Sequence, residues 1–367
     1  MSRKTTRRRA TGPPPPLRIR PGNPADDRTF RTALLRQADR LADGIILTTP
    51  TGDRHHDHER RHRAAGMWAY LLWAEDHQLT IPLLRRQPAE MTRNTFSSAL
   101  WLTRAIEQVT AHPSTQWITH PDYNPDLHTG APTPQAAARL IDWWAHVAPP
   151  LAYPTTDDQP TSITGWVIGD LLPLLSADRR TRHALVQTPS WVVDFILDQT
   201  LLPAAAEFRT QPLLTVIDPC CGTGHFLIRA VDALWQWYTT GTLTPRTGSN
   251  RTPVTGGRIW PANDAIRRVR ASVNGVDIDP LTAAVARLRL TVYLAHLMTE
   301  AGLLPNPLRL DQIPAWVAPR IGVGDSLLLG QISDAEYAQL HPALARLPGA
   351  GYGLADLHDL LGKGSRP

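Results

Sequence analysis

The sequence has only two cysteines among its 367 residues, Cys220 and Cys221, and they are adjacent. Such a pair excludes a framework of structural disulfides, which fits a reducing cytoplasm. No uninterrupted apolar stretch is long enough to cross a bilayer, and the basic N-terminus lacks the apolar segment of a signal peptide. We therefore expect a cytoplasmic protein without a membrane partner.

Lysine is also nearly absent, since Lys4 and Lys363 are the only two, and arginine supplies almost all of the positive charge. The formal net charge of +5 mildly favours polyanionic partners. The skew toward arginine equally fits GC-rich coding. The number of arginines therefore does not by itself identify a nucleic-acid-binding surface.

Composition and hydrophobic spacing divide the chain into four parts. Residues 1–26 are basic and proline-rich with little apolar surface, so we expect a disordered tail. Residues 27–150 predict a helical N-terminal domain, and residues 161–330 predict an α/β domain. Residues 331–367 form a C-terminal tail with one helix-like segment from Asp334 to Leu347. The helices expected in the N-terminal domain are Phe30 to Leu41, Arg60 to His77, Asn94 to Val109, and one that follows Thr133-Pro134.

A histidine-rich segment in the N-terminal domain raises the question of a metal site. It contains His55, His56, Asp57, His58 and His62, and the last two histidines lie one helical turn apart. Arginines are interleaved with these residues, and positive neighbours oppose a bound cation. We therefore favour a solvated, pH-sensitive helix face and assign no metal ligand.

The stretch from Leu213 to Ala230 organises the rest of the chain. The apolar run Leu213 to Ile217 predicts a strand buried on both faces, and Asp218-Pro219 ends it. Gly222-Thr223-Gly224 predicts a tight turn, and a helical pattern begins at His225. Strand, glycine turn and helix bring backbone N–H groups and a helix N-terminus to a ligand.

The details of this stretch decide between ligands. A dinucleotide fingerprint requires a third glycine where Leu227 stands, and a P-loop requires a lysine that is absent. The string from Asp218 to Leu227, DPCCGTGHFL, resembles motif I of S-adenosylmethionine-dependent methyltransferases. It is closest in form to the Asp-Pro-Ala-Cys-Gly-Ser-Gly-His-Phe-Leu pattern of adenine-specific DNA methyltransferases from restriction-modification and phage-defence systems.

This resemblance implies S-adenosyl-L-methionine as the cofactor and assigns residues to it. Motif X of the family matches Thr188-Pro189, where Thr188 is the expected N-cap and Pro189 the first helical residue, near the methionine part of the cofactor. The residues that match motif I and are expected to bind the cofactor are Asp218, Pro219, Cys221, Gly222, Gly224 and Phe226.

Two later segments complete the expected cofactor site. Thr239 to Arg258 predicts a loop, and Ser272 to Asp277 predicts the next strand. In the resembled family, motif II places an acidic residue, here Asp277, on both ribose hydroxyls, and an apolar residue, here Ile278, on the adenine face. Motif III corresponds to the segment around Asp325, which would receive the adenine amino group.

The family's catalytic motif, Asn/Asp-Pro-Pro-Tyr/Phe, does not follow Asp325, and Pro149-Pro150 lacks its flanking residues. We therefore assign no catalytic residue. The resemblance covers Gly165 to Leu329, the cofactor-binding half of a methyltransferase. Without a fourth strand, the strand from Leu213 would have an exposed edge. A second polypeptide would cover that edge, or the tail would cover it, or the chain is a truncated product.

These observations predict an α/β protein with a partial Rossmann-like methyltransferase domain after a helical N-terminal domain. The predicted function is methylation of the adenine exocyclic amine in DNA, either by this chain or by a split enzyme of which it is the cofactor-binding part. DNA and a protein that supplies the catalytic motif are the expected partners. The alternatives are a non-catalytic cofactor-binding or structural subunit of a DNA-modification or defence complex, and a methyltransferase for protein or RNA.

Overall fold

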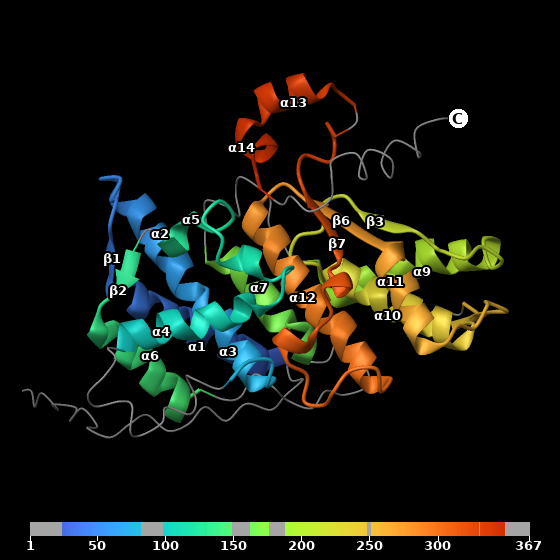
Figure 1. Ribbon diagram of the computed structural model, residues 1–367, viewed down its shortest axis with the longest axis horizontal. Coiled ribbons are helices and arrows are strands. Elements are labelled where there is room, and N and C mark those ends of the chain that lie inside the picture. Colours follow the sequence, from blue (N-terminus) through green and yellow to red (C-terminus); the bar gives the residue numbers. More distant parts are fainter. Residues whose placement is uncertain are drawn as a thin grey trace, which may run out of the picture.

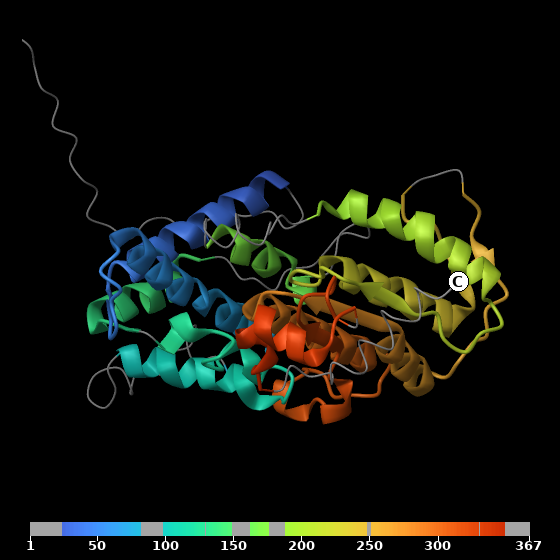
Figure 2. The ribbon, with the colours of Figure 1, turned by 90° about the horizontal axis from the view of Figure 1, so that it is seen from above.

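A computed structural model describes residues 24–81, 98–128, 130–148, 162–175, 188–247, 251–329 and 331–348. The N-terminal helices and the α/β part lie side by side along the long axis of the molecule (Figure 2). One continuous cluster of buried apolar side chains runs through both parts. Residues 1–23 of the expected tail and residues 149–161, between the two expected domains, lie outside the described residues, and the domain boundaries stay predictions.

The N-terminal part is mainly helical. Its elements are α1 (Pro24–Ala42), β1 (Ile45–Leu47), α2 (Arg54–Gly66), α3 (Trp68–Asp76), α4 (Ser98–Glu107), α5 (Pro125–His128), β2 (Gly130–Pro132) and α6 (Pro134–His146). Helix α6 begins as predicted, because the Thr133 side chain accepts a hydrogen bond from the Ala136 N–H. The antiparallel pair β1–β2 was not predicted.

Two predictions in this part were wrong in extent. The segment Arg60 to His77 is not one helix, because α2 and α3 are separated at Met67. There the Tyr70 N–H donates to the Met67 carbonyl three residues earlier, which is a 3₁₀-type bond rather than an α-helical one. Helix α1 also begins at Pro24, before the expected helix start at Phe30.

The α/β part is built on a parallel three-stranded sheet. Its strands are β3 (Val216–Asp218), β6 (Val273–Asp277) and β7 (Arg320–Val323), in the order β3-β6-β7. Strand β6 is central and buried throughout, whereas β3 is an edge strand of half-buried residues among those described. The prediction that Leu213 to Ile217 is a strand buried on both faces is therefore wrong. The Leu214 N–H donates to the Tyr238 hydroxyl instead of pairing with a strand.

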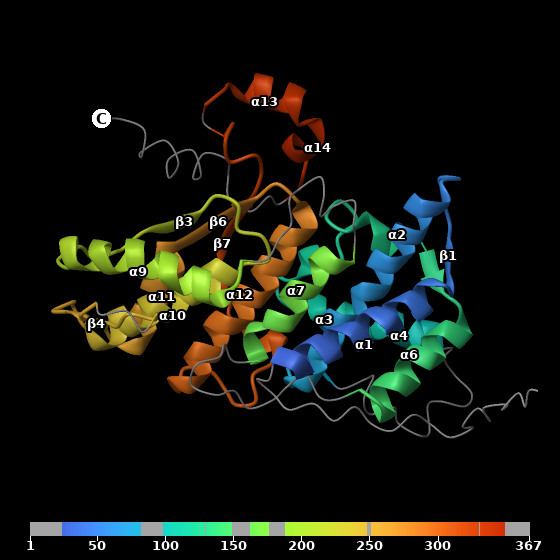
Figure 3. The same cartoon turned by 180° about the vertical axis from the view of Figure 1, so that it is seen from behind.

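Helices cover one side of this sheet (Figures 1 and 3). They are α9 (Ser190–Glu207), α10 (His225–Thr240), α11 (Ala262–Ser272) and α12 (Pro280–Glu300), while α7 (Trp166–Leu174) lies between α12 and the N-terminal helices. Among the described residues, α12 alone is long and apolar enough to cross a membrane, and 94% of that stretch is buried inside the protein. It is the central core helix of the α/β part.

The remaining elements correct two further predictions. The segment Thr239 to Arg258 is not only a loop, because it contains the antiparallel pair β4 (Thr242–Leu243) and β5 (Val254–Thr255). The tail segment Asp334 to Leu347 is two helices, α13 (Asp334–Leu340) and α14 (Pro342–Ala345), because a proline cannot continue the helix. Short 3₁₀ helices are η1 (Gln108–Ala111), η2 (Gln116–Ile118), η3 (Ser162–Thr164), η4 (Leu310–Gln312) and η5 (Ala315–Val317).

Candidate functional site

The glycine turn joins the carboxyl end of β3 to the first residue of α10. Its backbone is fixed by two hydrogen bonds, from the Cys221 N–H to the Val276 carbonyl at 2.8 Å and from the Gly224 N–H to the Cys221 carbonyl at 2.9 Å. Gly222 has φ +55° and Gly224 has φ +87°. Both values lie in the left-handed region that side chains with a Cβ rarely adopt, which explains why both positions are glycine.

The two glycines of the turn face different surroundings. A Cβ placed on Gly222 would meet no atom within 4 Å, whereas one on Gly224 would lie 3.4 Å from the Ala286 Cβ of α12. Gly222 therefore borders the open side of the turn, where a ligand can approach its backbone. Gly224 faces α12 at ordinary van der Waals distance, so its left-handed backbone rather than its packing requires glycine. Ligand contact at Gly224 stays a prediction.

Two predicted carboxylates stand at the ends of neighbouring strands, Asp218 on β3 and Asp277 on β6. The Asp218 Oδ1 accepts the Cys220 N–H at 3.1 Å, and burial raises the pKa of Asp218. The Asp277 Oδ2 accepts the Gly222 N–H at 2.9 Å, and its Oδ1 accepts the Asp279 N–H at 2.9 Å. Burial raises the pKa of Asp277 to about 6, opposed by these hydrogen bonds.

Ile278 and Asp279 follow directly after β6. Ile278 is half-buried beside Asp277, which leaves part of its side chain accessible. Asp279 caps α12, since its Oδ1 accepts the Thr282 N–H at 2.9 Å. This cap fixes the direction in which the chain leaves the strand. Ile278 is thus held at the carboxyl end of the sheet, and its contact with an adenine ring stays a prediction.

Asp325 lies just beyond β7 and is held by the tail helices. Its Oδ2 is 3.1 Å from the His341 Nε2, its Oδ1 accepts the Leu327 N–H, and its own N–H donates to the Tyr337 hydroxyl. Tyr337 also packs on Val276 of the central strand. The α13–α14 segment therefore covers this end of the sheet (Figure 1), which the sequence did not indicate.

The three carboxylates stand at the carboxyl ends of neighbouring parallel strands, since Asp218 ends β3, Asp277 ends β6 and Asp325 follows β7 by two residues. Partial desolvation of the nearby Cys220 thiol raises its pKa, and so do the negative charges of Asp218, Asp277 and Asp325. The structure thus brings together the acidic residues of motifs I, II and III around the start of the glycine turn. Cys220, which is exposed, was not among the predicted residues. Its signal in the sequence was its position between Pro219 and Cys221.

The other predicted residues occupy less central places. Helix α9 begins at Ser190 with Pro189 at the N-cap, so the prediction of Thr188 as N-cap and Pro189 as first helical residue is wrong by one position. Thr188, Pro189 and Pro219 are exposed, Phe226 is half-buried, and Cys221 is buried. No hydrogen bond joins Thr188 to the glycine turn in the described part of the chain.

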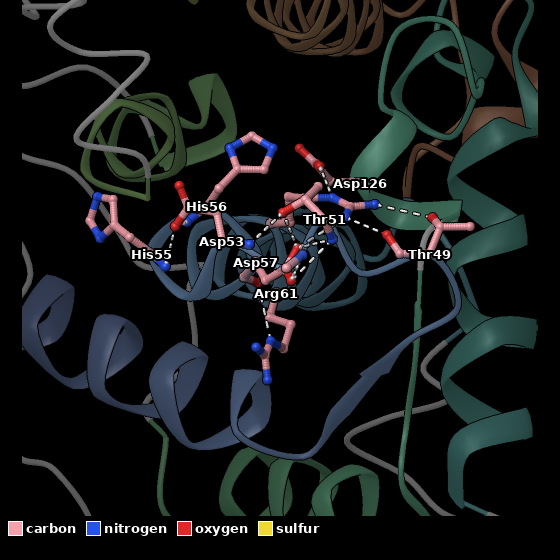
Figure 4. Close-up of polar contacts among 10 residues, drawn as sticks. Thr49, Thr51, Asp53, His55, His56, Asp57, Arg61 and Asp126 are labelled. Atoms are coloured by element: carbon pink, nitrogen blue, oxygen red, sulfur yellow. Dashed lines mark hydrogen bonds and ion pairs between the residues drawn. The ribbon is translucent and has the colours of Figure 1, made fainter.

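The histidine-rich segment in the N-terminal part does not converge on its aspartate. Asp57 points inward from α2, where it accepts the Thr51 and Gly52 N–H groups, and the Thr51 bond is the main cause that lowers its pKa. His55 and His56 point away from it (Figure 4). In the ranges that the structure describes, no group of three or more His, Cys, Asp and Glu side chains could hold a metal ion.

Arginines connect this cluster to the neighbouring helix α5. The Arg60 guanidinium donates to the Thr49 carbonyl at 2.7 Å, and the Arg63 Nε donates to Asp126 at 2.5 Å. All four charged groups of this set, Asp57, Arg60, Arg63 and Asp126, are buried. The cluster therefore ties a loop and two helices together, which is a structural role.

Comparisons with known proteins agree with the motifs. No family model matches the chain. A protein of Streptomyces coelicolor described as adenine-specific methyltransferase PglX is 34% identical over 238 residues, which are 62% of this chain and 17% of that protein. The chain thus spans a small part of the relative's length.

A solved structure described as a cryoEM structure of a DrdV–DNA complex aligns over 87% of this chain and 25% of that one, with 12% identity and a TM-score of 0.34, too low to support an argument. The predicted resemblance to adenine-specific methyltransferases is confirmed by the curated relative.

Proposed function

We propose that this chain is the cofactor-binding part of an adenine-specific DNA methyltransferase and binds S-adenosyl-L-methionine at the carboxyl ends of β3, β6 and β7. The observation that carries the proposal is the placement of Asp218, Asp277 and Asp325 at the carboxyl ends of three neighbouring parallel strands, with Asp277 bonded to the glycine turn. Ligands of parallel sheets bind at this end of the strands. The relative's description as an adenine-specific methyltransferase supports the same chemistry.

The donors and acceptors of the site fit this cofactor. Asp277 has two carboxylate oxygens that can accept the two ribose hydroxyls, and Asp325 can accept the adenine amine. Ile278 supplies an apolar surface for the adenine ring. The open side of Gly222 and the N-terminus of α10 suit the methionine carboxylate.

The net charge of the site suits the cofactor as well. S-adenosylmethionine carries a sulfonium and an ammonium group, and the three carboxylates give the site a negative field. Burial strengthens this field because water screens it less. The same site would bind the product S-adenosylhomocysteine, which lacks the sulfonium charge, less strongly through this field.

Methyl transfer to adenine needs more than the bound cofactor. The adenine amine is a poor nucleophile, because its lone pair is delocalised into the ring. In the resembled family, the Asn/Asp-Pro-Pro-Tyr/Phe motif orients that amine and stacks on the flipped base. We propose that another polypeptide supplies this motif and pairs with β3, which bonds only to β6 among the described strands.

A second candidate function is a non-catalytic cofactor-binding or structural subunit of a DNA-modification complex. The absence of the catalytic motif from the sequence favours it. The two functions differ in whether a partner restores methyl transfer. The alternative of a protein or RNA substrate differs in the acceptor that is methylated.

Two measurements test these proposals. Isothermal titration calorimetry with the purified, folded chain should show S-adenosylmethionine binding, and its absence would refute the cofactor site. Transfer of labelled methyl groups to adenine in DNA should be near background for the chain alone and should appear when a protein that contains the motif is added. Robust transfer by the chain alone would refute the split-enzyme proposal. Binding without transfer, whatever motif-containing protein is added, would favour the non-catalytic subunit.

A further inference from the structure

A buried polar network lies directly beneath the glycine turn and connects it to the N-terminal helices. We call it the Asp170 network, and it consists of Arg31 of α1, Asp170 of α7, Thr223 of the turn, His225 of α10 and Arg289 of α12. These residues come from five separate segments of the chain. None of them was predicted to have a role in the site.

Arg289 is the inner end of the network. Its side chain is fully buried, and burial lowers its pKa to about 10, while the negative charge of Asp170 opposes this shift. Its Nη1 donates to the Thr223 carbonyl at 2.6 Å, and its Nε donates to the Thr164 carbonyl at 2.8 Å. A buried arginine therefore holds the backbone of the turn from the interior side through a hydrogen bond.

The hydrogen bonds of Thr223 fix the orientation of its peptide group in the turn. The Thr223 carbonyl points toward Arg289 and the interior, so it does not face the side of the turn on which Gly222 is open. The Thr223 hydroxyl accepts from Arg289 at 3.2 Å and donates to the Gly169 carbonyl at 3.3 Å. A rotated Thr223 peptide would lose these bonds and would present a carbonyl oxygen to the ligand's carboxylate.

His225 lies between Arg289 and Asp170 and contacts both. Its Nδ1 lies 3.2 Å from the Thr223 Oγ1 and 3.4 Å from the Arg289 Nη1. Nε2 is 3.2 Å from the Asp170 Oδ1. The other oxygen of Asp170, Oδ2, accepts the Arg31 guanidinium at 2.9 Å. The contacts thus run unbroken from α1 to the first residue of α10.

The fit of α7 against the turn leaves no room for a looser arrangement. A Cβ on Gly169 would lie 2.3 Å from the Arg289 Nη1 and 2.8 Å from the His225 Cε1. Only glycine allows α7 to approach this closely. At the outer end of the network, the Arg31 and Asp170 side chains are 32% and 18% exposed. Substituting either residue therefore need not leave a cavity in the core.

We propose that Asp170 is a positioning residue that couples the N-terminal helices to the cofactor turn through His225 and Arg31. The proposal rests on the proposed binding of S-adenosylmethionine. It explains why a methyltransferase core would need the helices that precede it. Breaking the Arg31–Asp170 contact between α1 and α7 should weaken cofactor binding at the turn. Neither of these two residues is itself expected to contact the cofactor.

The test is a double-mutant cycle on cofactor affinity. Arg31→Ala and Asp170→Asn should each raise the calorimetric Kd for S-adenosylmethionine by roughly three- to tenfold, since each removes the charge-assisted Arg31–Asp170 hydrogen bond at the outer end of the network. The double variant should be no weaker than the worse single one, because both act through one contact. Arg31→Lys, which keeps the charge, should recover most of the affinity. Arg309→Ala is the matched control, because Arg309 pairs with Asp311 on the surface.

A second readout separates positioning from general stability. Amide hydrogen exchange in the peptide that contains Gly222 to Gly224 should quicken in Asp170→Asn, while exchange in α12 stays as in the wild type. If the wild type binds the cofactor and both single variants have the same Kd as the wild type, the coupling is refuted while the proposed function stands. The coupling is also refuted if the losses of affinity in the two variants add up and follow a general drop in the unfolding temperature. Absence of binding by the wild-type chain would instead refute the proposed function, and the coupling with it.

Discussion

The Asp277 carboxylate and the Gly222 backbone are joined across the site, with Oδ2 2.9 Å from the amide nitrogen. This bond ties the end of the central strand to the glycine turn. An ionised carboxylate has about four acceptor positions. Two of those on Asp277 are used by the Gly222 and Asp279 N–H groups, which leaves capacity for two ribose hydroxyls.

The first prediction concerns the pH dependence of cofactor affinity. Burial raises the pKa of Asp277 to about 6, so the unliganded group is largely protonated at pH 5 and ionised at pH 7. The carboxylate accepts hydroxyl donors better than the neutral acid, so affinity should rise with pH through about 6. Calorimetry from pH 5 to pH 7.5 would show this step. Asp277→Asn should bind more weakly and without the step near pH 6, and an unaltered step in that variant would assign it to another group.

The same shift predicts a change in stability with the opposite sign. Because the folded-state pKa of Asp277 is higher than the ordinary aspartate value of 3.8, protonation stabilises the fold. This contribution is complete below about pH 4 and is lost as pH rises through about 6, with a loss of about 3 kcal/mol at most. Urea denaturation of the wild type and of Asp277→Asn without cofactor would reveal the difference. Equal pH profiles for the two proteins would contradict it.

Removing the Asp277 carboxylate should weaken cofactor binding strongly. Loss of a charge-assisted hydrogen bond costs about 1.5–3 kcal/mol, so Asp277→Ala should raise the Kd by roughly one to two powers of ten. Asp311→Ala is a suitable control, because Asp311 is an exposed carboxylate. Fluorescence or calorimetric titration of the two variants gives the comparison. Equal Kd values for Asp277→Ala and Asp311→Ala would show that Asp277 does not bind the cofactor.

The two glycines should respond differently to substitution. Gly224→Val should disrupt the turn and abolish binding, because a β-branched residue is forced to φ +87° against Ala286. Gly222→Ala should lower the unfolding temperature less, because its Cβ enters open space, yet it should still weaken binding where the ligand approaches. Thermal unfolding and titration distinguish the two. Full cofactor affinity in Gly222→Ala would show that the ligand does not approach this side of the turn.

The contact between His341 and Asp325 should oppose cofactor binding. The His341 Nε2 occupies an oxygen of Asp325 that the adenine amine would use. His341→Ala should therefore tighten S-adenosylmethionine binding by a few fold, roughly the worth of one modest hydrogen bond. His296→Ala, which removes a surface histidine paired with Glu300, serves as the control. Weaker binding in His341→Ala would instead mean that the histidine supports the adenine pocket.

Local chemistry in the sequence was enough to predict the glycine turn, the Thr133 cap and the acidic residue at the end of β6. Each of these depends on residues close in the chain: a left-handed backbone needs glycine, and an N-cap needs a side-chain acceptor two or three residues before the N–H it satisfies. The order of motifs then placed Asp218, Asp277 and Asp325 at the same end of the sheet. The parallel order β3-β6-β7 has the three aspartates at that end, and their contact with a cofactor stays a prediction.

Contacts between distant residues could not be predicted in this way. The Asp170 network joins residues from five segments, and no periodicity relates Arg31 to Asp170 or Asp170 to His225. The extent of β3 was likewise decided in three dimensions, because the Tyr238 hydroxyl takes the Leu214 N–H that a longer strand would have used. Hydrogen-bond partners are chosen by the packing of whole helices. The sequence alone determined what chemistry the turn can offer, and the tertiary structure decided which side chains hold it in place.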